Sequence, residues 1–175
     1  FCKNVEKELE EVLQSEELTE ELKKELSKLN EELYSVSVQM NHERQKAAKI
    51  LEDRIGSELA DVEMKNAKFK VNIEFDDRVY DNGERKYTGN GLDRVEFLIS
   101  PNVGEPLKPL SKIASGGEMS RIMLAIKNIL ANVDSIPTLI FDEIDIGISG
   151  RASQKVGEKL SSISKNHQVI CVTHL

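Results

Sequence analysis

Two acidic residues and one histidine follow short apolar runs of the sequence, and their types suit chemistry on a phosphate. Asp142 and Glu143 come directly after Thr138–Phe141. His174 comes two residues after Val169–Val172. If both runs are parallel strands, their carboxyl ends meet at the sheet edge where α/β proteins bind ligands. Adjacent acids there point to opposite sides, so one carboxylate can hold Mg²⁺ while the other orients a water. The alternative is that the acids only begin a loop and cap a helix.

A second candidate site is the run Ser115-Gly116-Gly117-Glu118, which precedes a strongly apolar segment. Consecutive glycines let the backbone approach a ligand, and the amino end of a helix offers unpaired N–H groups that bind phosphate. The same run also fits an ordinary helix start, because a serine followed three residues later by a glutamate is a capping box. The run alone leaves both interpretations open, and the order of the later segments favours the phosphate interpretation.

The first 66 residues are predicted to be helical. One apolar seam has steps of four and three residues, as in a helix that faces a partner helix, and its members are Leu22, Leu26, Leu29, Leu33, Val36 and Met40. A second stripe at mostly four-residue steps indicates packing on a globular surface, and it consists of Ala47, Leu51, Ile55, Leu59 and Val62. We expect the helix to end near Asn66, with a weak signal for a break at residues 14–19.

From Phe69 onward the pattern changes to alternating strands and helices. The predicted strands are residues 69–75, 95–99, 138–141 and 169–172, and the predicted helices are 122–133 and 154–163. The first two strands are expected to pair antiparallel, followed by a proline-containing loop over residues 101–109. The last two strands are continuously apolar and flank a helix, which is typical of a parallel sheet with both faces covered.

Composition excludes several classes of protein. The 175 residues carry a formal charge of -7, so there is no basic field to gather nucleic acid non-specifically. No apolar run approaches the roughly 18 to 20 residues that span a bilayer, and the start has neither a signal peptide nor an initiator Met. We therefore expect a cytoplasmic protein cut from a longer chain. Two cysteines and three histidines lack the spacing of a zinc site, and disulfides are not expected.

The ordered motifs resemble the RecN-type family of bacterial DNA-repair proteins, which are SMC-like ABC ATPases. Four strings carry the resemblance: IASGGEMSR at 113–121 for the ABC signature, TLIFDE at 138–143 for Walker B, DIGISG at 145–150 for the D-loop and VTH at 172–174 for the switch-histidine strand. The similarity is dense over residues 95–175 and looser over 40–75. The first 40 residues match only as coiled coil.

The resemblance implies a fold. The expected class is α/β, a partial ABC-ATPase head in which a parallel sheet with covering helices and a short antiparallel strand pair follow a long coiled-coil helix. We expect stem helices over residues 1–66 and the C-terminal lobe of the head over 67–175, truncated after His174.

The resemblance also implies roles in ATP binding. The signature residues would contact ATP held by an opposing head, and they are Ser115, Gly116, Gly117 and Glu118. Glutamate at the last of these positions fits SMC-like heads, whereas transporters usually have glutamine.

For hydrolysis, Asp142 would support Mg²⁺, Glu143 would polarise the attacking water and His174 would contact the γ-phosphate. The D-loop residues would be Asp145, Gly147 and Ser149. Serine at the last position replaces the usual aspartate, which leaves the role of this loop open. The implied cofactors are ATP and Mg²⁺, required only in the complete two-lobed head.

A phosphate-binding loop is missing from the sequence. Such a loop needs Gly-Lys followed by Ser or Thr, because the lysine neutralises the β- and γ-phosphates. None of the ten glycines is followed by lysine. The chain is therefore expected to be inactive alone, with its Walker A motif in an N-terminal lobe across the coiled coil.

The implied function is ATP hydrolysis in DNA double-strand-break repair and recombination, where ATP joins two heads and hydrolysis releases them. Implied partners are the chain's own N-terminal head lobe, a second head as a homodimer, and DNA through the full-length protein, with no membrane. The implied location is the cytoplasm, associated with the nucleoid. Two alternatives stay open: another SMC-like or Rad50-like chromosome or repair ATPase, and a non-enzymatic coiled-coil interaction module in which both motifs are caps.

Four further residues are expected to be structural. Arg121 is expected to form a surface salt bridge with Glu118, although it could also steer phosphate. His42 and His167 are expected to be solvated, and Cys171 is expected to fill space in a buried strand.

Overall fold

A computed structural model describes residues 2–80, 83–113, 115–131, 133, 135–148 and 150–173, and for residues 2–10 it describes the backbone alone. The chain divides into two units. The first unit comprises Phe1–Glu43 and Phe75–Asp93, and the second comprises Arg44–Glu74 and Arg94–Leu175. No helix among these described residues combines the length and apolar character needed to cross a membrane.

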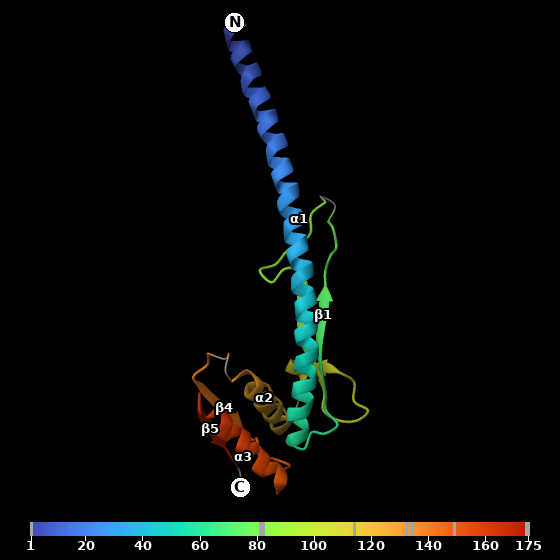
Figure 1. Ribbon diagram of the computed structural model, residues 1–175, viewed down its shortest axis with the longest axis vertical. Coiled ribbons are helices and arrows are strands. Elements are labelled where there is room, and N and C mark those ends of the chain that lie inside the picture. The colour runs from blue at the N-terminus through green and yellow to red at the C-terminus, as the bar shows by residue number, and fades with distance from the viewer. Residues whose placement is uncertain are drawn as a thin grey trace. The chain divides into compact units, whose positions relative to one another are not determined.

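The first element is the helix α1, Cys2–Asp61, whose 60 residues run without interruption (Figure 1). Leucine, glutamate and lysine favour helix, and proline is absent from this stretch, so the weakly predicted break at residues 14–19 does not occur. The helix ends earlier than the predicted Asn66. The amides of Val62 and Met64 both donate to the carbonyl oxygen of Leu59, and Glu63 takes a left-handed φ of 62°. That conformation cannot continue a right-handed helix.

In the first unit, the segment from Arg85 to Gly91 packs on α1. The Arg85 guanidinium carbon lies 4.1 Å from the centroid of the Tyr34 ring, a cation–π geometry. Ser37 is buried beneath Gly91, where an added Cβ would lie 3.4 Å from the serine Oγ. Gly91 also has a φ of 79°, so both close approach and conformation favour glycine at this position.

A three-stranded sheet contains β1 Lys68–Phe75, β2 Asp93–Ser100 and β3 Lys108–Pro109, in that order. The Asp76 amide, just after β1, donates to the carbonyl oxygen of Leu92, just before β2, so these strands run in opposite directions as predicted. The third strand, antiparallel to β2, was not predicted, because its residues lie in the proline-containing segment. A short 3₁₀ helix, Leu110–Lys112, follows it.

The remaining elements form the predicted strand–helix–strand unit after one further helix. They are α2 Gly116–Leu130, β4 Thr138–Asp142, α3 Arg151–Ile163 and β5 Gln168–Val172. Strands β4 and β5 pair in parallel, with Asp142 opposite Val172, which confirms the predicted parallel arrangement (Figure 1). Both helices begin earlier than predicted.

Only one face of the β4–β5 pair is covered by the described residues, so the prediction of two covered faces is wrong. Leu139 and Phe141 point into the core, which they share with α2 and α3. Ile140, between them, is 68% exposed, and Val172 is also exposed. Cys171 is exposed as well, so its predicted role as a buried filler is wrong.

The hydrophobic core belongs to the second unit. Residues that are fully buried there come from α1, the turn after it, β2, α2 and α3, and they include Ile55, Leu59, Val62, Ile99, Ile122, Leu124 and Ile163. Ile55, Leu59 and Val62 belong to the predicted second stripe, which the structure confirms as a packing face.

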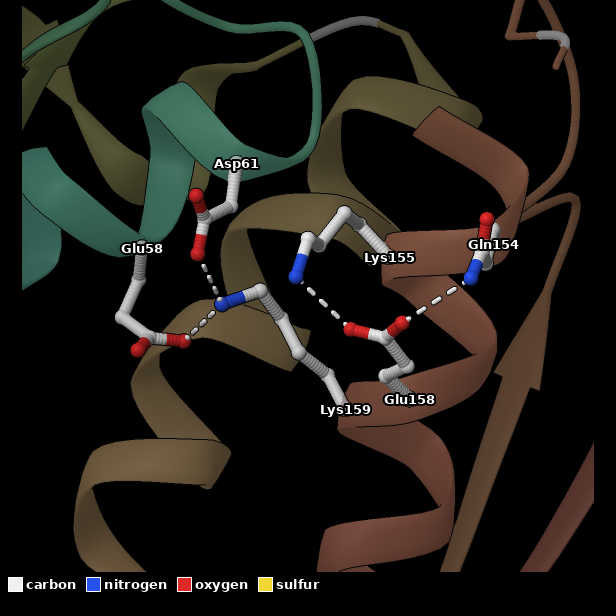
Figure 2. Close-up of polar contacts among 6 residues, drawn as sticks. All are labelled: Glu58, Asp61, Gln154, Lys155, Glu158 and Lys159. Atoms are coloured by element: carbon white, nitrogen blue, oxygen red, sulfur yellow. Dashed lines mark hydrogen bonds and ion pairs between the residues drawn. The ribbon is translucent and has the colours of Figure 1, made fainter. Parts of the chain in front are cut away.

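A buried lysine links the end of α1 to α3 (Figure 2). The Lys159 Nζ lies 2.7 Å from Glu58 Oε2 and 2.9 Å from Asp61 Oδ2, and Asn128 donates to the same glutamate. Burial acts to lower the pKa of Lys159, but the hydrogen bonds to both acids outweigh it and raise that pKa. The hydrogen bond from Lys159 in turn lowers the pKa of Asp61. This ion cluster fixes α3, which begins directly after the turn that follows β4.

Candidate functional site

The amino end of α2 begins at the predicted capping serine. Ser115 has extended φ and ψ angles of -87° and 121°, and its side chain accepts a hydrogen bond from the Glu118 amide at 3.4 Å. The Met119 amide donates to the Ser115 carbonyl oxygen at 3.0 Å. The serine therefore acts as an N-cap, and the glycines after it, Gly116 exposed and Gly117 buried, begin the first turn of the helix.

The two glycines lie directly against Glu143. A Cβ added to Gly116 would collide with the Glu143 carboxylate. One added to Gly117 would lie 3.1 Å from the Glu143 carbonyl oxygen, closer than nearly all real Cβ contacts. The sequence predicted these motifs as separate sites, and the structure brings them together because glycine permits the approach.

The turn after β4 positions the acids. Asp142 is exposed at the carboxyl end of the strand, and Glu143 is half-buried. Glu143 takes a left-handed φ of 57°, which is uncommon for a residue other than glycine. Its carbonyl oxygen accepts a hydrogen bond from the Ile146 amide at 3.2 Å, and Gly147 follows with a φ of 75°. This turn directs the neighbouring carboxylates into different environments.

Two residues of α2 hold this turn. The Ser120 hydroxyl donates to the Asp142 carbonyl oxygen at 2.5 Å, and Arg121 Nη1 donates to the Ile146 carbonyl oxygen at 2.7 Å. Arg121 is only 9% exposed, so the prediction of a surface salt bridge is wrong. Burial lowers the pKa of Arg121, against the opposing effect of the Glu118 charge.

Asp145 lies in the same turn, and both of its carboxylate oxygens are buried without a hydrogen-bond partner among the described residues. Burial raises the pKa of the Cys171 thiol on β5, and the negative charge of Asp145 adds to this effect. The predicted D-loop residue Asp145 therefore lies near Cys171 of β5, with its carboxylate oxygens buried.

Some predicted site residues lie outside the described residues, namely Ser149 and His174. The strand that precedes the histidine is described, and its last residue, Val172, lies opposite Asp142 in the parallel register. The carboxyl ends of both strands therefore meet at one edge, as predicted.

The donor set fits Mg²⁺ only in part. No group of three or more histidine, cysteine or acidic side chains that could hold a metal occurs in the described part of the chain. Mg²⁺ is usually bound through one or two carboxylates together with substrate phosphates and water. The exposed Asp142 carboxylate fits one such position.

Sequence reasoning missed the buried positions of Arg121 and His167. The His167 ring nitrogens lie 2.7 Å from the Ile136 carbonyl oxygen and 3.1 Å from that of Ala131, and the residue is 7% exposed, so its predicted solvation is wrong. For Arg121 a signal existed, because it lies four residues after Gly117 and four before Ala125, on one helical face.

The long helix α1, the parallel pair β4–β5 and the helices that cover one of its faces define the class of the chain as α/β. Over its whole length it is 37% identical to the DNA repair protein RecN of Halalkalibacterium halodurans and 38% identical to that of Bacillus subtilis. The chain belongs to the RecN family. RecN of Treponema pallidum is 60% identical over 85 residues, 49% of this chain and 15% of the relative. The chain spans 30% of the length of the first relative and 32% of the second.

No protein-family model matches the chain. Solved structures similar to it include an Smc head domain with a coiled coil and joint from Pyrococcus yayanosii, at a TM-score of 0.46 and 19% identity, covering 74% of this chain and 22% of that one. A second is an SmcHead bound to the C-winged helix domain of ScpA, at a TM-score of 0.45 and 19% identity, covering 74% and 35%. The family assignment rests on the sequence relatives.

Proposed function

We propose that this chain is the C-terminal part of an ATPase that acts in DNA double-strand-break repair and recombination. ATP bound between two heads drives their association, and hydrolysis releases them. The partners are an N-terminal lobe of the same protein, a second head and, through the full-length protein, DNA in the nucleoid of the cytoplasm. The observation that carries this proposal is the contact between Gly116 and the carboxylate of Glu143, which joins the signature and Walker B motifs.

At the carboxyl end of β4, the two acids have different tasks. Asp142 is exposed and supplies a carboxylate to Mg²⁺, which when bound neutralises phosphate charge. Glu143 is half-buried and set apart by its left-handed backbone, so its carboxylate is free to orient and polarise a water. His174 at the neighbouring strand end contacts the γ-phosphate in this proposal.

At the amino end of α2, Ser115 and the two glycines contact the γ-phosphate of ATP held by the opposing head. The bond between the Ser115 hydroxyl and the Glu118 amide is 3.4 Å long, beyond the usual range for a good hydrogen bond. If the Ser115 hydroxyl bonds a phosphate in place of the Glu118 amide, the helix therefore loses little stability. The first turn of the helix supplies further N–H groups.

The domain organisation follows from the same proposal. Residues 1–66 form the stem, and residues 67–175 form the C-terminal lobe of the head. The D-loop residues lie between the Walker B acids and α3, and they are Asp145, Gly147 and Ser149. Serine stands at position 149 where the usual D-loop has aspartate, so in this proposal the contacts of the loop fall to Asp145 and Gly147.

The decisive test replaces Ser115 with arginine in the full-length protein. A bulky cation at this position blocks the approach of the nucleotide held by the opposing head. Ser115→Arg should therefore bind ATP normally, but its heads should not associate with each other when ATP is present. Loss of a cap alone costs roughly 0.5 to 2 kcal/mol of stability and has no selective effect on association. Thermal melting measures the loss of the helix cap, and light scattering in the presence of ATP measures the association of the heads. The two measurements together distinguish a block of association from the loss of a cap. A variant that melts early but still dimerises with ATP would contradict the proposed role of the signature.

The chain alone is a second test. We expect no ATPase activity and no measurable binding of Mg-ATP by titration calorimetry. The reason is that a phosphate-binding loop needs a Gly-Lys pair, and no glycine in this sequence is followed by lysine. Saturable binding in the micromolar range would contradict the division of the nucleotide site between two lobes.

A further inference from the structure

Ser120 and Arg121 form a link between the start of α2 and the turn after β4. Their side chains bond the two ends of one short segment, at the carbonyl oxygens of Asp142 and Ile146. The proposed base, Glu143, lies inside this segment. Neither linking side chain has a part in the proposed nucleotide contacts.

The buried guanidinium is the stronger half of the link. A buried charge is costly unless its donors find partners, and Arg121 Nη1 has the Ile146 carbonyl oxygen at 2.7 Å. The Nε of the same side chain is buried without a partner among the described residues. An apolar residue would fill this space at lower cost, so the arginine is better explained by the position it gives the turn than by stability.

Gly117 makes the link rigid. A Cβ added there would lie 3.1 Å from the Glu143 carbonyl oxygen, 3.4 Å from Arg121 Nη1 and 3.5 Å from Ile146 Cβ. The backbone of α2 therefore rests directly on the turn, with no side chain between them. A small displacement of the helix start cannot be absorbed at this contact, because packed interiors are dense and transmit strain.

We propose that Arg121, assisted by Ser120, is a positioning residue that couples the start of α2 to the carboxylate of Glu143. This inference rests on the proposed function, in which Ser115–Gly117 contacts the nucleotide of the opposing head while Glu143 acts on the nucleotide of its own head. When the second head binds at the start of α2, any displacement of the helix is then transmitted to the turn that carries Glu143. The two nucleotide sites that one head touches are then linked through the carbonyl groups of Asp142 and Ile146.

The test uses the full-length protein and compares Arg121→Met, Arg121→Lys and Ser120→Ala. Arg121→Met keeps an unbranched apolar stem, which is shorter than that of arginine, and removes every donor. It should lower kcat for ATP by about tenfold, because misplacement of a reacting group by about 1 Å can cost about a hundredfold. The KM for ATP should stay within about twofold, since the link does not touch the nucleotide. Arg121→Lys restores a charged donor and should recover most of kcat.

Arg54→Met on the exposed side of α1 is the matched control and should behave as wild type. A wild-type kcat for Arg121→Met would overturn the inference. The same holds if kcat falls only in proportion to thermal stability and Arg121→Lys does not recover it, because Arg121 then only holds the fold. Should Arg121→Met fail to fold, Ser120→Ala decides, with an expected loss of about threefold in kcat, and a wild-type kcat would reject the link.

Glu143→Gln, measured in parallel, separates this inference from the proposed function. If Glu143→Gln is inactive and Arg121→Met is fully active, the coupling alone is wrong. If Glu143→Gln itself hydrolyses ATP normally, the assignment of the base is wrong.

Discussion

The two ends of α1 carry similar apolar periodicity and have opposite environments. Toward its carboxyl end, in the second unit, Ile55 and Leu59 are fully buried. In the first unit, Leu22 and Leu26 are 56% and 50% exposed, although they belong to an equally regular seam. Periodicity therefore identifies a face that packs, but it does not identify what covers that face. In the second unit, other elements of this chain cover the apolar face of α1. In the first unit, the exposed seam is consistent with the proposed partner helix of a coiled coil.

The largest expected effect tests this contrast directly. Leu59→Ala should destabilise the chain by about 3 kcal/mol, because it removes a fully buried side chain and leaves a cavity. Leu26→Ala should cost less than about 0.5 kcal/mol, as expected for a half-exposed position. Urea denaturation followed by circular dichroism measures both. Equal losses would show that the seam is already covered in the isolated chain.

The next prediction compares the loss of a carboxylate at the candidate site, in the second unit, with the loss of an exposed carboxylate in the first unit. In the full-length protein, Glu143→Gln should leave ATP binding nearly intact and slow hydrolysis at least about a hundredfold, as expected when a water-orienting group is lost. Glu31→Gln, at an exposed position on α1, should hydrolyse ATP at the wild-type rate. Steady-state turnover and nucleotide binding are the measurements. Normal turnover by Glu143→Gln would remove the functional distinction between the units.

The smallest effect compares two ion pairs. Lys159 lowers the pKa of Asp61, so this pair stabilises the fold above the ordinary aspartate value of 3.8, and the stabilisation is lost as the pH falls through the lowered pKa. Asp61→Asn should therefore cost less than about 1 kcal/mol at pH 7, because the aspartate is half-exposed, and nothing at a pH below the lowered pKa of Asp61. Glu20→Gln breaks the exposed pair with Lys23 and should cost nothing measurable at either pH. Thermal melting at both pH values checks the difference, and a loss for Asp61→Asn that does not depend on pH would contradict the role of the ion pair.

The elements that bury their own apolar residues were predictable. Alternation predicted β1 and β2, and continuous apolar runs predicted β4 and β5, because side-chain direction is fixed by the period of each element. The same runs could not reveal the open face at Ile140. A continuously apolar run predicts that both faces of a strand pack, but it does not identify what covers each face.

The residue types of the candidate site were predictable, but their mutual geometry was not. Strand ends and glycine pairs predicted where Asp142 and Gly116 lie in the fold. The burial of Arg121 was missed because arginine is almost never fully buried unless it is paired, and its partner is a backbone carbonyl with no sequence signal. The end of α1 was missed for a similar reason, since glutamate at Glu63 carries no mark of a left-handed conformation.

The left-handed backbone of Glu143 has a consequence for how this sequence responds to selection. A side chain held in this region costs about 1 kcal/mol relative to glycine, which adopts the conformation freely. A library screened only for heat resistance should therefore enrich glycine at position 143 and discard the carboxylate. A library screened for survival of the host after DNA breakage should retain glutamate and accept the lower melting temperature. Thermal robustness and biological fitness are thus opposed at this one position.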